Sequence, residues 1–149
     1  MIQTDLIVED ENWRTCGDLD AICRQAFAAA TAQQPAEGVI AVLLTNDDAL
    51  QTLNAQFRGK DKPTDILSFA ADEMARPQIG DLALAHGVAA KDAATRNIPL
   101  ADHLMHLLIH GYLHVLGHDH EDAAEAAEME GLEINALASL GLSNPYSKS

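Results

Sequence analysis

Residues 103–120 read HLMHLLIHGYLHVLGHDH, a run in which leucine and histidine recur at helical spacing. Apolar residues at this spacing indicate one face of a helix, so we predict a helix over 100–116, bounded by Pro99 and Gly117. Four histidines of this helix fall within about 80° of arc at 100° per residue. They are His103, His106, His110 and His114.

Two of these histidines are placed to share one metal ion. His110 and His114 stand at i and i+4, about 6 Å apart on one helix face. A glycine at 117 can adopt the left-handed conformation that ends a helix, which turns the chain back and brings His120 to the pair as a third ligand. Three neutral imidazoles with an open fourth position describe a catalytic zinc site, and the alternative is a histidine cluster satisfied by neighbouring groups.

The resulting pattern HxxxHxxGxxH has the ligand spacing of metzincin proteases, whose motif is HExxHxxGxxH. In those enzymes the glutamate is the general base that takes a proton from zinc-bound water. Position 111 of this chain is glycine, so the sequence lacks the group that amide hydrolysis most needs. A phosphodiester is the better substrate, because zinc and arginine can together clamp its charged phosphoryl group.

The rest of the chain alternates strand and helix patterns. We predict strands at 3–8, 38–44, 65–70 and 79–85, and further helices at 18–33, from Thr45 or Asn46 to about Gln56, 87–96 and 121–140. A short loop around Pro77 predicts a hairpin-like connection between the last two strands. This order predicts an α+β fold with a mixed four-stranded sheet and packed helices, in one domain over 1–149.

Composition agrees with a globular protein and limits its partners. Of the 149 residues 48% are hydrophobic, which supplies a core, while 4% aromatic residues favour helices over an all-β sandwich. The 23 Asp and Glu against nine Lys and Arg leave a formal charge of −14, which disfavours broad duplex binding. A local basic spot can still hold RNA at short range.

The first residues, MIQTDLIVEDENW, contain no basic region and no long apolar run. We therefore expect neither a signal peptide nor a membrane partner, and we expect a cytoplasmic protein. The two cysteines, Cys16 and Cys23, form neither a disulfide framework nor a paired-cysteine metal site.

Four segments of the chain carry a family resemblance. HGYLHVLGHDH at 110–120 is similar to the motif HGxLHLxGYDH and departs from it at Val115 and His118. LNAQFRGKDKPTDILSF at 53–69 resembles LNxxyRgkdkpTDVLSF, IGD at 79–81 resembles a GD strand, and GLSNPY at 141–146 resembles a usual ending. These motifs are those of the YbeY endoribonuclease family, and the resemblance covers essentially the whole chain.

The resemblance implies a single-strand-specific, metal-dependent endoribonuclease that acts in maturation of ribosomal RNA, including the 3′ end of 16S rRNA, and in ribosome quality control. It implies one zinc ion held by His110, His114 and His120 on a zincin-like helix, with Arg58 beside the metal for catalysis. Single-stranded RNA, ribosomal RNA and the ribosome are the implied partners. His118 replaces the family's tyrosine and adds an imidazole near the expected ligands.

A basic loop is the expected RNA contact. Arg58, Lys60 and Lys62 place three of the nine basic residues within five positions. The guanidinium of Arg58 suits a pair of phosphate oxygens better than an ammonium group does. The alternative is an ordinary solvated loop. In a protein of charge −14, a short-range contact beside zinc favours single strands over a wrapped duplex.

Other polar residues near these motifs have simpler interpretations. Asp119 either orients an imidazole or stabilises a turn, and we expect His106 to be packed or exposed. Asp65 and Asp81 flank predicted strands, where we expect them to cap turns. Residues 119–133 hold seven acids, and we interpret them as the solvated acidic face of a helix and not as a metal site.

Two other classes of function remain open from the sequence. One is a metallopeptidase, against which Gly111 argues. The other is a non-catalytic ribosome assembly factor whose zinc is only structural. An open coordination position at the metal would argue against that second class.

Overall fold

The computed structural model describes residues 1–119 and 121–146. Its elements follow the predicted order, with bounds that differ from the predictions by a few residues at most. Two short 3₁₀ helices, η1 and η2, were not predicted. In chain order the elements are β1 (Ile2–Val8), η1 (Glu11–Cys16), α1 (Leu19–Gln33), β2 (Gly38–Thr45), α2 (Asp47–Arg58), β3 (Ile66–Ala70), η2 (Glu73–Ala75), β4 (Gln78–Ala85), α3 (His86–Thr95), α4 (Leu100–Val115) and α5 (Ala123–Ser139).

The four strands form one mixed sheet in the order β1-β2-β4-β3. Strand β2 pairs parallel with both β1 and β4, whereas β3 pairs antiparallel with β4. Parallel neighbours need a crossover, and α1 supplies it between β1 and β2. The prediction of an α+β fold with a mixed four-stranded sheet is confirmed.

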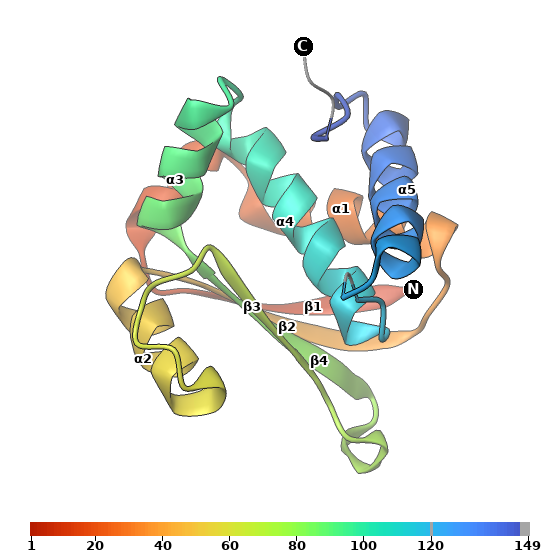
Figure 1. The fold of residues 1–149 in the computed structure, drawn as a ribbon, viewed down its shortest axis with the longest axis horizontal. Coiled ribbons are helices and arrows are strands. Elements are labelled where there is room, and N and C mark those ends of the chain that lie inside the picture. The colour runs from red at the N-terminus through yellow and green to blue at the C-terminus, as the bar shows by residue number, and fades with distance from the viewer. Residues whose placement is uncertain (120, 147–149) are drawn as a thin grey trace.

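Alternate residues of the strands enter two separate cores, because successive side chains point to opposite faces of a sheet. On β4, Leu82 and Leu84 join the large core under α1, α4 and α5, while Ala83 and Ala85 join a small core under α2. Figure 1 shows α1, α4 and α5 on one side of the sheet and α2 on the other. The helix predicted to bear the metal ligands therefore lies on the thickly covered face.

Side chains cap the helices that flank the site. Asn46, one of the two predicted caps of α2, accepts a hydrogen bond from the backbone N–H of Ala49 at 2.9 Å. Asp122 caps α5 in the same way through the N–H of Glu125 at 2.8 Å.

None of the helices in the described part of the chain has the length and apolar character that a membrane span requires.

Helix α4 approaches the sheet very closely at Gly111. A Cβ atom at this position would lie 2.7 Å from Cδ2 of Leu82 and 3.0 Å from Cδ1 of Ile66. Contacts this short leave no room for a side chain, since buried atoms already pack at crystal-like density. Position 111 thus packs against the sheet, and a glutamate there would have to displace Leu82 and Ile66.

Candidate metal centre

Two histidine rings, those of His110 and His114, lie close together near the C-terminal end of α4. The Nε2 atoms of His110 and His114 lie 3.0 Å apart, and both side chains are partly buried. Ligand nitrogens that share one tetrahedral ion at about 2.0–2.1 Å are separated by about 3.3 Å. The predicted i, i+4 pair therefore has a geometry suited to a shared metal ion.

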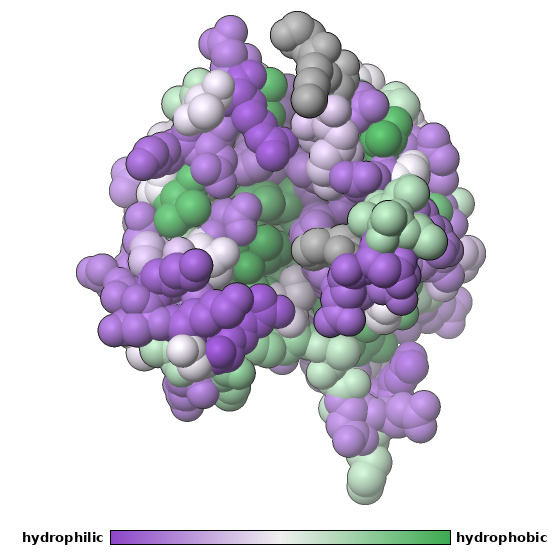
Figure 2. Space-filling view, viewed as in Figure 1, coloured by the Kyte–Doolittle hydropathy of each residue, from purple (hydrophilic) through white to green (hydrophobic). Residues whose placement is uncertain are grey.

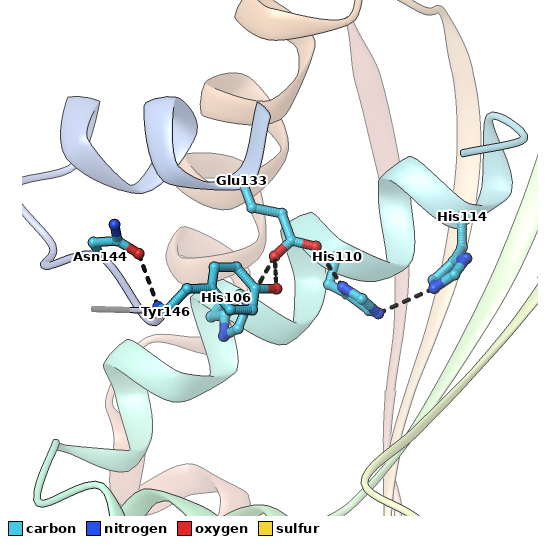
Figure 3. Close-up of polar contacts among 6 residues, drawn as sticks. All are labelled: His106, His110, His114, Glu133, Asn144 and Tyr146. Carbon is cyan, nitrogen blue, oxygen red and sulfur yellow. Dashed lines mark hydrogen bonds and ion pairs between the residues drawn. The ribbon is translucent and has the colours of Figure 1, made fainter. Parts of the chain in front are cut away.

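Glu133 of α5 contacts His110 on the side of the ring away from His114, as Figure 3 shows. Its side chain is fully buried, and Oε1 accepts a hydrogen bond from Nδ1 of His110. Oε2 lies 3.0 Å from Nε2 of His106 and also accepts a hydrogen bond from the hydroxyl of Tyr146. The ligand atoms of His106, His110 and Glu133 all lie within 4.8 Å of one another, so this cluster could hold a metal ion.

The interpretation of 119–133 as a solvated acidic face was wrong at Glu133. This carboxylate belongs to the buried side of α5, which it shares with Met129, Ala136 and Leu137. The signal was present in the sequence, because Glu133 stands four residues after Met129 and four before Leu137. A carboxylate in the apolar stripe of a helix needs a buried partner, and His106 and His110 provide it.

Hydrogen bonding keeps Glu133 ionised despite its burial. Burial alone would raise the pKa of this carboxyl group, but hydrogen bonds from His106, His110 and Tyr146 outweigh that effect and hold the pKa at about 2. An ionised Glu133 fixes the proton of His110 on Nδ1. The lone pair of Nε2 is then directed toward His114, which is the arrangement that metal-ligating histidines use with a supporting carboxylate.

The chain turns after α4 at Gly117, as we predicted from the sequence. Gly117 has φ +97°, and α4 ends at Val115. The N–H of Gly117 donates to the carbonyl of His114, and the N–H of His118 donates to that of Leu113, which together make a Schellman ending. His120, the predicted third ligand, lies outside the described residues.

His118 faces away from the histidine pair. Its Nε2 donates to Oε1 of Gln34 at 3.2 Å, at the end of α1. The backbone carbonyl of the same glutamine accepts a hydrogen bond from the hydroxyl of Tyr112. Gln34 therefore connects the turn after α4, through His118, with α4, through Tyr112.

Arg58 shares a cavity with the histidine pair. This residue is exposed and ends α2, yet it lines the same cavity of about 600 Å³ as His110, His114 and Asp119. Figure 2 shows this face of the molecule hollowed between the α2 side and the α5 side, with hydrophilic surface on both rims. The fold thus brings together an arginine and two histidines that lie 52 and 56 positions apart in the sequence.

The basic loop after α2 lines a second cavity, next to the first. Arg58, Lys60 and Lys62 border it together with Asp65 and Asp92, and its volume is about 390 Å³. Buried Asn54 holds this loop in place, because its side-chain amide donates to the carbonyl of Lys62 at 3.0 Å and its own carbonyl accepts from the N–H of Lys60.

The two aspartates that were expected to cap turns differ in position. Oδ1 of Asp65 accepts a hydrogen bond from the N–H of Ile66 at 2.8 Å, so Asp65 does support the start of β3. It also borders both the histidine cavity and the basic cavity. Asp81 lies within β4 and is exposed, so it caps no turn.

The site thus combines the imidazoles of His110 and His114 with the buried carboxylate of Glu133, and Arg58 lines the same cavity as the two histidines. The family model described as Endoribonuclease YbeY matches residues 7–141. This chain belongs to the YbeY family. The resemblance stated from the sequence motifs is confirmed.

Relatives of the YbeY family align over nearly the whole chain. A protein of Maricaulis maris named Endoribonuclease YbeY is 47% identical over 148 residues, which cover 98% of this chain and 92% of that protein. A protein of Dinoroseobacter shibae with the same name is 41% identical and is covered to 89% of its length, with 95% of this chain aligned.

A solved structure has the same fold. The solution structure of a Thermotoga maritima protein superposes with a TM-score of 0.59 and covers 99% of this chain and all of that chain. Its sequence identity is 22%, so the comparison bears on the fold alone.

Proposed function

We propose that this protein is a zinc-dependent endoribonuclease that cleaves single-stranded RNA, built as one domain over 1–149. The observation that carries the proposal is the shared cavity of Arg58 with His110 and His114. Relatives at 41–47% identity carry the name of this activity. The metal ligands in this proposal are His110, His114 and His120, one ion in all.

The residues of the cavity have separate roles in this proposal. A zinc ion bound by the histidines would polarise a phosphoryl oxygen or lower the pKa of a water molecule. Arg58 would bind two phosphate oxygens with its planar guanidinium and stabilise the charge that develops on them. Glu133 would keep Nε2 of His110 directed at the ion, and Lys60 and Lys62 would contact the next phosphates of the strand.

Single-stranded RNA fits the distribution of charge. The chain carries a formal charge of −14, so only a narrow basic region can hold a phosphate backbone. That region is the loop of Arg58, Lys60 and Lys62, which borders two adjoining cavities and not a broad surface. A flexible single strand can follow such a path, whereas a duplex presents both backbones to an acidic protein.

The cellular setting is also part of the proposal. From the family resemblance we infer ribosomal RNA as the substrate, including the 3′ end of 16S rRNA, with the ribosome as partner, a role in ribosome quality control and a cytoplasmic location. A metallopeptidase is disfavoured, because Gly111 is packed against Leu82 and offers no general base. A non-catalytic assembly factor with structural zinc is the remaining competitor.

Cleavage of an end-labelled single-stranded RNA tests the proposal. The purified protein is compared with a His114→Ala variant prepared identically, which controls for contaminating nuclease. Loss of cleavage in the variant, with restoration of wild-type cleavage after chelation and return of Zn²⁺, would establish metal-dependent activity. Equal cleavage by both preparations would point to a contaminant, and no cleavage by either would favour the assembly factor.

A further inference from the structure

His103 is buried on α4 without a hydrogen-bond partner. Its side chain is 2% exposed, and neither Nδ1 nor Nε2 has a partner within residues 1–119 and 121–146. A buried polar atom left unsatisfied costs about 1–3 kcal/mol, so native proteins rarely leave both atoms of one ring in this state. The ring therefore points to a ligand that completes it.

Two carboxylates face this ring from other elements. Asp65 immediately precedes β3 and Asp92 lies on α3, and both are partly buried. One ligand atom from each of Asp65, Asp92 and His103 lies within 4.8 Å of the other two. Two ligands on opposite sides of one divalent cation lie about 4–5 Å apart, so small side-chain rotations would bring all three onto one ion.

The protonation state of His103 suits a ligand. Burial lowers the pKa of this imidazole, His106 and Arg96 lower it further, and Asp65 and Asp92 only partly oppose the shift. The ring is then neutral near pH 7 and has a lone pair to donate. A neutral ring also cannot form an ion pair with the two aspartates.

We propose that Asp65, Asp92 and His103 form a second cation site, distinct from the histidine pair and suited to a divalent ion of the Mn²⁺ kind. Two carboxylates favour the harder ions Mg²⁺ and Mn²⁺, while an imidazole favours Mn²⁺ over Mg²⁺. The site shares no side chain with His110, His114 or Glu133.

The place of this site gives it a use in RNA binding, and that use rests on the function proposed above. Asp65 and Asp92 border the basic cavity, where two negative charges face the three positive charges of Arg58, Lys60 and Lys62. A divalent cation would neutralise the negative charges of both carboxylates, so that the three basic side chains could bind a phosphate group. Asp65 also borders the histidine cavity, so the ion would lie beside the path of the strand.

Binding of Mn²⁺ to zinc-loaded protein tests the site without any RNA. The zinc content is measured before and after Mn²⁺ titration, and bound Mn²⁺ is counted by electron paramagnetic resonance. The variants are Asp92→Asn, His103→Gln and, as a matched control, Asp102→Asn, which removes the same charge one residue from His103 and outside the cluster. Circular dichroism and Tm show whether each variant is folded.

The expected result is one additional Mn²⁺ per zinc-loaded chain, weakened at least tenfold by Asp92→Asn and His103→Gln and retained by Asp102→Asn. If His103→Gln does not fold, Asp92→Asn decides the matter. The proposal is overturned if zinc-loaded protein binds no Mn²⁺, if Asp92→Asn binds it as the wild type does, or if Asp102→Asn weakens it equally. The last result would mean general attraction to an acidic protein.

The outcome is independent of the endoribonuclease proposal. Binding of Mn²⁺ without RNA cleavage would support the second cation site and contradict the proposed function. RNA cleavage with Zn²⁺ alone, without any binding of Mn²⁺, would support the proposed function and contradict the second cation site.

Discussion

Glu133 and His110, 23 residues apart on two helices, form a buried hydrogen-bonded pair in which Oε1 accepts from Nδ1. This contact determines which ring nitrogen of His110 can bind a metal, since the proton is held on the side of α5. The other ring nitrogen, Nε2, is the one that faces Nε2 of His114. We therefore expect the metal affinity of His110 and His114 to depend on a residue of another helix.

Replacement of Glu133 by glutamine should weaken metal binding about 10- to 100-fold, the usual effect of losing the group that orients a metal-bound histidine. Glutamine has nearly the same shape but lacks the negative charge that favours the Nδ1 proton of His110. Competition with a chelating dye measures the Zn²⁺ affinity. Glu128→Gln on the exposed side of α5 is the matched control, and equal affinities of the two variants would contradict the role of Glu133.

Replacement of Arg58 by glutamate should abolish RNA cleavage and leave zinc bound. The change reverses the charge opposite the histidine pair but touches neither proposed ligand on α4. Single-turnover cleavage and the zinc content of the same preparation measure the two effects. Arg24→Glu on α1 makes the same charge reversal at another exposed position and should cleave normally. Cleavage by Arg58→Glu at the parental rate would remove the support for a catalytic arginine.

Two Gly→Ala substitutions should change stability in opposite directions. At Gly111 the new methyl group meets Leu82 at 2.7 Å, and overpacking typically costs about 1–3 kcal/mol, more than the helix propensity of alanine returns. A Cβ added at Gly131 on α5 would meet no atom of the described residues within 4 Å outside its own helical turn, so alanine should raise the free energy of unfolding by about 1 kcal/mol. Urea titration measures both. A stabilised Gly111→Ala would show that α4 does not pack so closely on the sheet.

The free energy of unfolding should decrease at alkaline pH because Tyr112 is buried. Burial raises the pKa of this phenol to about 12, whereas an unfolded tyrosine loses its proton near pH 10. Between these values the unfolded state releases a proton that the folded state retains, so the free energy of unfolding decreases as the pH rises. Tyr112→Phe should flatten that decrease between about pH 10 and 12. An unchanged slope in the variant would assign the alkaline loss to other groups.

Local patterns accounted for the strands and α-helices and for two of the three proposed metal ligands. Each predicted strand and helix rests on apolar periodicity within its own segment, and the pair His110 and His114 follows from helical geometry over four residues. The turn at Gly117 is likewise local, because a positive φ is a property of one residue and its neighbours. Such features need no knowledge of what packs against them.

Contacts between distant segments could not be derived in this way. The acidic composition of 119–133 concealed that Glu133 is buried, since the charge of a segment does not say which face meets a partner. The position of Arg58 against α4 depended on the place of α2 across the sheet, and the family motif, not the periodicity, indicated it.

The sequence by itself determined the strands and α-helices, the spacing of His110 and His114 on α4, and the family, because each is encoded in short runs of residues. Only the tertiary structure decided which buried groups support those ligands, and which carboxylates face the unpartnered ring of His103. The physical reason is that burial and hydrogen-bond partners depend on the packing of three or more elements, and no local pattern specifies how those elements meet.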